Sequence, residues 1–165
     1  MIFLTVGTQF PFDRLVKAVD DLFDRGLIHE QVVAQIGDSK YRPRHFEAVA
    51  SLDKSAFDRN IRHASAIISH AGMGTITTAL ENSKPLLAMP RRKKYGEVVN
   101  DHQVVLAIKF EALGHILLAR DETELGEKIV QLKSFIPQPR RVDPSAVSRR
   151  IAGFLERLKQ DDGSS

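Results

Sequence analysis

The 165-residue chain contains no cysteine, which excludes a disulfide framework and any metal site built from thiolates. It also lacks anything near the roughly 18 consecutive apolar residues that a membrane-spanning helix needs. The apolar segment Met1–Val6 has no basic region before it and is too short for the apolar part of a secretion signal. We therefore expect a cytoplasmic domain that folds around an ordinary hydrophobic core.

Neither sign of charge is in large excess: the chain has 24 Lys and Arg residues and 21 Asp and Glu residues, which gives a net charge of +3. That excess is too small to indicate nucleic acid, and we expect no nucleic-acid partner. Basic residues are nevertheless concentrated at Arg91–Lys94, directly after Met89-Pro90. This block fits a solvated loop, and equally a contact with an anion, an acidic partner or an anionic membrane surface.

Several signatures of nucleotide and hydrolytic enzymes are missing. The chain has no Gly-Lys-Ser/Thr phosphate loop, no Gly-x-Ser-x-Gly elbow, no His spacing typical of metal sites and no Asp-x-Asp pair. We therefore predict no metal and no cofactor. A bound phosphate would then be met by backbone N–H groups, a helix N-terminus and basic side chains.

Short apolar runs alternate with amphipathic stretches along the chain. Strands are predicted where the runs end at glycine or polar residues, namely Met1–Val6, Gln31–Ile36, His45–Ala50, Ala66–Ser69, Pro85–Met89 and His115–Ala119. Helices are predicted at the helical spacings between them, namely Pro11 to Gly26, Asp53 (as N-cap) through Ile61, Thr75–Asn82, Val98–Leu113, Asp121–Leu132 and 143–159.

This alternation predicts an α/β fold, a Rossmann-like parallel sheet with helices on both faces. The length predicts one domain over residues 1–160, followed by a tail at 161–165. The helix expected at 143–159 carries apolar residues on one face, which we expect to serve either a partner or the domain's own core.

The strongest local signal is the passage from the strand Ala66–Ser69 through His70-Ala71-Gly72-Met73-Gly74-Thr75 into a helix. Such a turn aims backbone N–H groups and a helix N-terminus at one point, which suits a phosphate. Two glycines there let a ligand approach the backbone closely, or else serve only the turn. Likewise, His70 is either structural or a hydrogen-bonding partner of a diphosphate or sugar hydroxyl.

Other polar segments are expected at the same edge, because the carboxyl ends of parallel strands lie together. Gly7-Thr8-Gln9 follows the first strand, Pro90–Lys94 follows the fifth, and Asn100-Asp101-His102-Gln103 adds a dense set of hydrogen-bonding side chains. Together they predict a site for a nucleotide joined to a hydroxyl-rich group. A dinucleotide enzyme with Arg91 on a 2′-phosphate stays an alternative, although Thr77 stands where a third glycine would fall.

The chain resembles the C-terminal domain of family 28 glycosyltransferases. The likeness rests on His70-Ala71-Gly72-Met73-Gly74-Thr75, Leu80-Glu81-Asn82-Ser83-Lys84-Pro85, Pro90-Arg91, Tyr95-Gly96-Glu97 and Asn100-Asp101-His102-Gln103, with Val6-Gly7-Thr8-Gln9 and Phe12-Asp13-Arg14-Leu15 near the N-terminus. It is greatest to soluble halves of split enzymes, including donor-binding subunits of bacterial exopolysaccharide transferases and the cytosolic half of the eukaryotic dolichol-linked UDP-GlcNAc transferase. The fold implied is the C-terminal half of GT-B.

The resemblance also implies roles for individual residues. Gly72, Met73, Gly74 and Thr75 would line the diphosphate with support from His70, Arg91 would contact the donor, Asp101 and Gln103 would reach sugar hydroxyls, and Gly7 and Thr8 would lie in the cleft facing acceptor and partner. Thr78 stands where many relatives have a ribose-binding Glu, and Glu81, about one turn later, is the candidate substitute.

The function implied is that of the donor-binding subunit of a two-chain, inverting UDP-sugar transferase. A membrane-anchored partner would bring a polyprenyl-diphosphate-linked acceptor and supply the general base, so this chain would lie at the inner face of the membrane and be nearly inactive alone. The alternative is a non-catalytic accessory protein that stabilises or stimulates a partner transferase.

Overall fold

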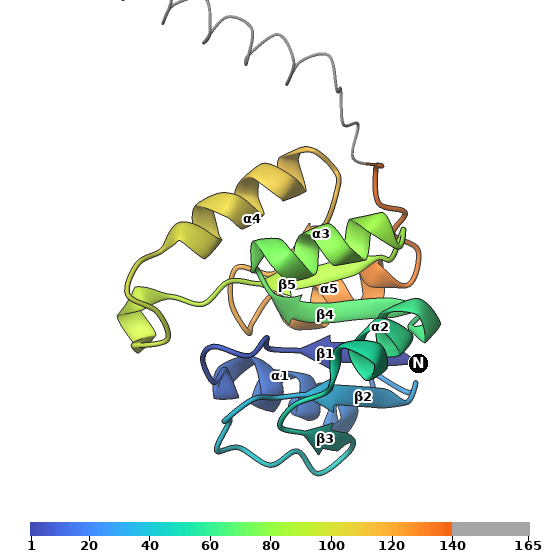
Figure 1. Cartoon of the computed structure of the whole chain (residues 1–165), viewed down its shortest axis with the longest axis vertical. Coiled ribbons are helices and arrows are strands. Elements are labelled where there is room, and N and C mark those ends of the chain that lie inside the picture. The colour runs from blue at the N-terminus through green and yellow to red at the C-terminus, as the bar shows by residue number, and fades with distance from the viewer. Residues whose placement is uncertain (140–165) are drawn as a thin grey trace, which may run out of the picture.

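The structure, a computed structural model, describes residues 1–139 (Figure 1). The strands are β1 (Ile2–Thr5), β2 (Val32–Gln35), β3 (Glu47–Val49), β4 (Ala66–His70), β5 (Leu86–Met89) and β6 (Leu117–Leu118). The helices are α1 (Asp13–Asp24), α2 (Lys54–His63), α3 (Met73–Glu81), the 3-10 turn η1 (Lys93–Tyr95), α4 (His102–Ala112) and α5 (Leu125–Leu132).

The strands form one six-stranded sheet in the order β3-β2-β1-β4-β5-β6, and every neighbouring pair is parallel. In Figure 1 the labelled strands β5, β4, β1, β2 and β3 lie one below another, with β3 lowest. The predicted parallel sheet is confirmed. The order of the strands reverses between β1 and β4, and in open α/β sheets that point opens a crevice at the carboxyl edge where ligands bind.

Alternating side chains of the strands build a core on each face of the sheet. Ile2 and Leu4 of β1 pack into one core with α1 and α5, whereas Phe3 packs into the other with α2, α3 and α4. Residues on successive positions of a strand point to opposite faces, so a strand buried on both sides reads as a continuous apolar run. Helices on both faces are confirmed.

Two predicted helices begin four residues later than their sequences indicate. The helix expected from Val98 starts at His102, because η1 and then Gly96, with φ 70°, turn the chain before it. The helix expected from Asp121 starts at Leu125, since the Asp121 carboxylate instead accepts hydrogen bonds from the N–H and hydroxyl of Thr123. Side chains that cap a local turn compete with helix formation in this way.

The predicted helix at 143–159 and the tail at 161–165 lie outside the described residues. Before that point, the Gln138 N–H donates to the Gly114 carbonyl at 2.8 Å, which places residue 138 beside the end of α4. Within residues 1–139, no helix is both long and apolar enough to cross a membrane.

Candidate functional site

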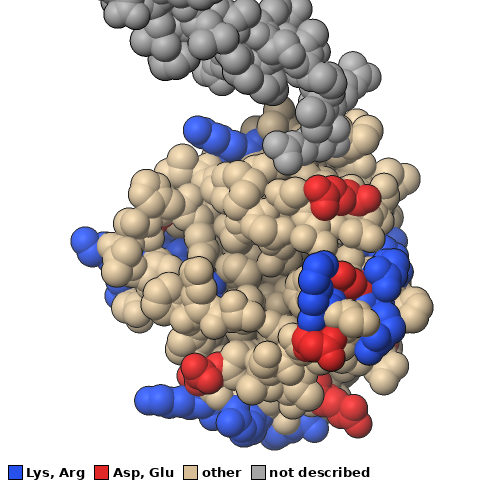
Figure 2. Space-filling view, in the orientation of Figure 1, with Lys and Arg blue, Asp and Glu red and all other residues tan. Residues whose placement is uncertain are grey.

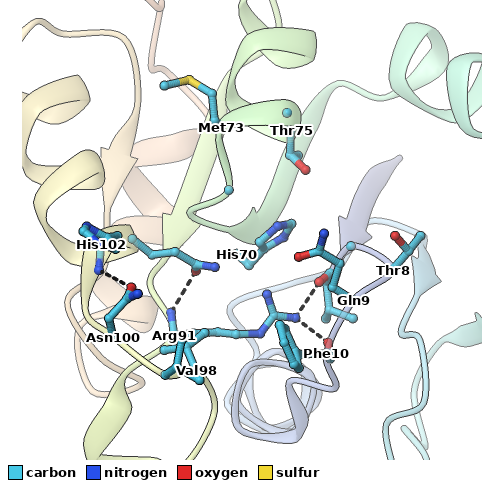
Figure 3. Close-up of a pocket in the computed structure, with 16 residues that line it drawn as sticks. Thr8, Gln9, Phe10, His70, Met73, Thr75, Arg91, Val98, Asn100 and His102 are labelled. Atoms are coloured by element: carbon cyan, nitrogen blue, oxygen red, sulfur yellow. Dashed lines mark hydrogen bonds between the residues drawn. The ribbon is translucent and has the colours of Figure 1, made fainter.

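A cleft of about 480 Å³ opens at the crevice between β1 and β4 (Figure 3). Three segments form its walls: the loop after β1, the β4–α3 turn and the segment between β5 and α4. The lining residues are Val6, Gly7, Thr8, Gln9, Phe10, His70, Gly72, Met73, Gly74, Thr75, Arg91, Val98, Val99, Asn100, His102 and Gln103. The sequence-based prediction that these segments converge is confirmed.

The β4–α3 turn presents the N-terminus of α3 to this cleft. Gly72 is the N-cap residue, and no side chain of residues 1–139 caps the helix. The N–H groups of the first helical turn have no partner inside a helix, so they remain available to an anion, which the helix dipole also favours. A Cβ built on Gly74 would meet nothing within 4 Å, so this position opens onto free space.

His70 stands at the end of β4 with its ring against two glycines. A Cβ at Gly7 would lie 2.8 Å from the ring, and one at Gly72 would overlap His70 Nε2. Burial, together with the charge of Arg91, lowers the pKa of His70 to about 4. The imidazole is therefore neutral at physiological pH, and its buried Nδ1 has no hydrogen-bond partner among the described residues.

Arg91 lies at the base of the cleft and links the loop after β5 to the loop after β1. Its Nη2 donates to the carbonyls of Val6 at 2.6 Å and Phe10 at 2.5 Å, and its guanidinium lies 5.0 Å from the centre of the Phe12 ring. Burial lowers its pKa to about 10, so it stays charged at neutral pH. Arg91 thus lines the cleft while its Nη2 and Nε hold the loop after β1.

The Asn100–Gln103 motif divides between the cleft and its support. Gln103 lines the cleft, and its Oε1 accepts from the Arg91 N–H at 3.2 Å, which leaves its amide N–H groups as donors. Asp101 does not line the cleft, because its Oδ1 accepts from the Lys93 N–H at 2.9 Å and holds η1 instead. Asn100 and His102 also face the cleft, although only Asp101 and Gln103 were assigned to sugar hydroxyls.

A second pocket of about 330 Å³ adjoins the first, and both share Gly7, Thr8, Gly74 and Thr75 as a common wall. Its remaining lining residues are Thr5, Gln35, Leu52, Lys54, Phe57 and Thr78. Gln35, Leu52, Lys54 and Phe57 were not expected at the site. Their place in the sequence could have indicated them, because Gln35 ends β2 and the other three follow β3, at the same edge of the sheet.

Thr78 lines the second pocket, but Glu81 does not. The Thr78 hydroxyl donates to the Gly74 carbonyl at 2.9 Å. Glu81 is exposed at the far end of α3 and lines neither pocket. The expectation that Glu81 takes the place of a carboxylate at Thr78 therefore finds no support in the geometry.

Arg91 is the one Lys, Arg, Asp or Glu residue among the described residues that line the cleft. Residues 1–139 contain no group of three or more His, Asp or Glu side chains placed to hold a metal ion. On the face seen in Figure 2, Lys and Arg lie in separate groups with Asp and Glu among them, so no continuous basic surface covers it. The cleft itself offers backbone N–H groups, hydroxyls, amides and the buried charge of Arg91.

A sequence model of the glycosyltransferase family 28 C-terminal domain matches residues 1–158. The chain belongs to this family. This family 28 domain is 32% identical over 124 residues to the UDP-N-acetylglucosamine transferase subunit ALG13 of Homo sapiens. The aligned residues cover 70% of this chain and 10% of the human protein. The ALG13 subunit of Yarrowia lipolytica is 25% identical over 144 residues, covering 76% of this chain and 68% of that one.

Solved structures agree on the fold of this family 28 domain. An NMR structure of ALG13 has a TM-score of 0.58 and 22% identity, with 87% of this chain and 91% of that chain covered. Os79 from O. sativa, solved in complex with UDP, has a TM-score of 0.60 and 16% identity, covering 80% of this chain and 32% of that one. The expected Rossmann-like half of a GT-B enzyme is thus confirmed. The chain spans only about a tenth of the human relative it matches.

Proposed function

We propose that this chain is the donor-binding subunit of a two-chain glycosyltransferase that acts on a UDP-sugar. The observation that carries the proposal is the uncapped N-terminus of α3, opening between two pockets at the β1–β4 crevice. An extended ligand with a central diphosphate fits this arrangement. The relatives named as UDP-N-acetylglucosamine transferase subunits make UDP-N-acetylglucosamine the first donor to test.

The two pockets suit the two ends of such a donor. The diphosphate would lie on the shared wall of Gly7, Thr8, Gly74 and Thr75, where the N–H groups of α3 point. The sugar would lie toward Asn100, His102 and Gln103, whose side chains can bond hydroxyl groups. The nucleoside would lie in the second pocket against the apolar side chains of Leu52 and Phe57.

Transfer in this scheme is inverting: an acceptor hydroxyl attacks the anomeric carbon, and UDP leaves with its charge held at α3. We propose that a membrane-anchored partner holds a polyprenyl-diphosphate-linked acceptor and supplies the general base. The chain would then act at the cytoplasmic face of the membrane, in lipid-linked oligosaccharide or exopolysaccharide synthesis. We expect almost no transfer by the isolated chain, because nothing brings the acceptor to the donor.

A calorimetric titration of the purified chain with UDP, UDP-N-acetylglucosamine and NADPH tests the proposal. We expect both uridine compounds to bind and NADPH not to bind, since Arg91 is committed to the carbonyls of Val6 and Phe10. Gly74→Val should weaken UDP binding at least tenfold, because its side chain fills the space at the N-terminus of α3. Binding of UDP that survives this substitution would contradict the assigned site.

One observation favours an accessory role instead. Among the described residues no carboxylate lines the second pocket, so a ribose there would find only neutral acceptors, such as the oxygen of the Thr78 hydroxyl, which donates its hydrogen to the Gly74 carbonyl. A protein that stabilises a partner transferase needs no donor affinity. The same titration on the co-purified complex separates the two functions, because an accessory protein adds no UDP site that Gly74→Val removes.

A further inference from the structure

Arg14, on the first turn of α1, makes more polar contacts than any cleft-lining residue described above, although it does not line the cleft. Its Nε and Nη2 donate to the two carboxylate oxygens of Glu97 at 2.8 and 2.9 Å, a two-pronged pair. Its Nη1 donates to Glu122 at 2.7 Å. The Arg14 and Glu97 side chains are only 14% and 11% exposed, so the pair is shielded from water.

The same contacts fasten the chain that follows β5. Arg14 Nη2 also donates to the Pro90 carbonyl at 3.3 Å, and its guanidinium lies 4.5 Å from the centre of the Tyr95 ring. Glu97 in turn accepts from the Arg92 N–H at 2.8 Å. Arg14 thus holds the chain on both sides of η1. Burial lowers its pKa, but the bonds to Glu97 and Glu122 outweigh burial and the net pKa is raised.

The fastened segment leads directly into the wall of the cleft. Val98, Val99 and Asn100 line the cleft, and they lie between Gly96 and the start of α4, outside any helix or strand. In Figure 1 the yellow-green part that carries η1 extends to the left of the sheet. Such a segment has little packing of its own, so its shape depends on side-chain bonds that reach it from elsewhere.

We propose that Arg14 is a positioning residue for the donor: through Glu97 it sets the shape of the Arg92–Asn100 segment that contacts the sugar end of the ligand. This inference rests on the proposed function. Lysine cannot replace it, because an ammonium group lacks the planar fork that engages both carboxylate oxygens and a carbonyl together. The second pocket, where we propose that the nucleoside lies, has no residue of this segment in its lining.

The experiment compares UMP with UDP-N-acetylglucosamine as ligands of the wild type, Arg14→Lys and Glu97→Gln. We expect UMP to bind both variants within twofold of the wild type and UDP-N-acetylglucosamine to bind at least fivefold more weakly. Lys17→Met is the matched control on α1, since it removes only an exposed ion pair with Asp21. Amide hydrogen exchange should quicken over residues 92–101 in both variants, and not over β1, β4 or β5.

Each outcome of this comparison has a distinct meaning. Equal weakening of both ligands, or unchanged binding of UDP-N-acetylglucosamine, would overturn the positioning role while leaving the proposed function intact. Failure of the wild type to bind either ligand would overturn the proposed function and the link to the donor. Unchanged exchange over residues 92–101 would overturn the hold of Arg14 on the segment, whether or not a ligand binds.

Discussion

At the scale of single residues, the site depends on glycines, which have no side chain, as much as on residues whose side chains line it. The ring of His70 occupies space that a Cβ on Gly7 or Gly72 would enter, whereas Gly74 faces open space. The sequence shows two glycines in one turn but not that they differ in role. Gly72 makes room for a protein side chain, and Gly74 leaves room beside the N-terminus of α3.

Alanine at these two glycines should therefore give opposite results. Gly72→Ala forces the buried His70 ring or the backbone to shift, and we expect a loss of about 1–3 kcal/mol of unfolding free energy. Gly74→Ala clashes with nothing and sits in a helix, so stability should be unchanged or rise by up to about 1 kcal/mol. Urea unfolding measures both, and equal losses would contradict the distinction.

His70 should also make stability depend on pH in a defined window. Its pKa is about 4 in the folded chain, because of burial and the charge of Arg91, and about 6.5 when unfolded. The unfolded chain takes up a proton first as pH falls, so stability is full above pH 6.5 and declines toward pH 4. The decline amounts to at most about 3 kcal/mol.

His70→Asn should flatten unfolding free energy between pH 6.5 and pH 4, as measured by urea denaturation across that range. Asp20 acts in a separate window: burial raises its pKa, but hydrogen bonds from Tyr41, Arg44 and His45 outweigh burial and lower it overall. Its contribution is lost only as pH falls below its unfolded pKa of about 3.9. A His70→Asn variant that keeps the wild-type slope above pH 4 would refute the assignment.

At the scale of helices and strands, the sequence predicts elements well where the residues themselves determine them. All six strands were predicted; β1, β2, β4 and β5 are largely buried, and parallel strands buried on both faces are runs of apolar residues, whereas β3 is mostly exposed. The N-cap at Asp53 was predicted too, and its carboxylate accepts from the Ala56 N–H at 2.7 Å. The start of α4 was not predicted, since Val98-Val99 is apolar and helical in pattern while side-chain bonds to η1 decide its actual path.

The candidate site, too, could be predicted from the sequence only in part. Convergence of the glycine turns follows from strand order and is predictable. The positions of Arg91 and Asp101 are not, because each is fixed by partners far away in sequence or by a loop whose shape has no pattern. Polar residues in a motif predict that a site is near, but not which of them face the ligand and which hold the others.

At the scale of the whole molecule, the site depends on how the sheet places three segments around one cleft. The reversal of strand order between β1 and β4 brings the loop after β1, the N-terminus of α3 and the segment after β5 around one cleft. The described residues form the walls of that cleft. A two-chain transferase would be completed by a partner that faces it with the acceptor, as we propose.

The most direct test of this placement is an amide NMR titration of the isotope-labelled chain with UDP. The account predicts the largest shifts at Gly7, Thr8 and Gly72–Thr75, with smaller shifts at Leu52 and Thr78 and none around the pocket at the opposite edge lined by Ile2, Pro85 and Lys133. Shifts concentrated at that opposite edge, or an unchanged spectrum at millimolar UDP, would contradict a donor site at the N-terminus of α3.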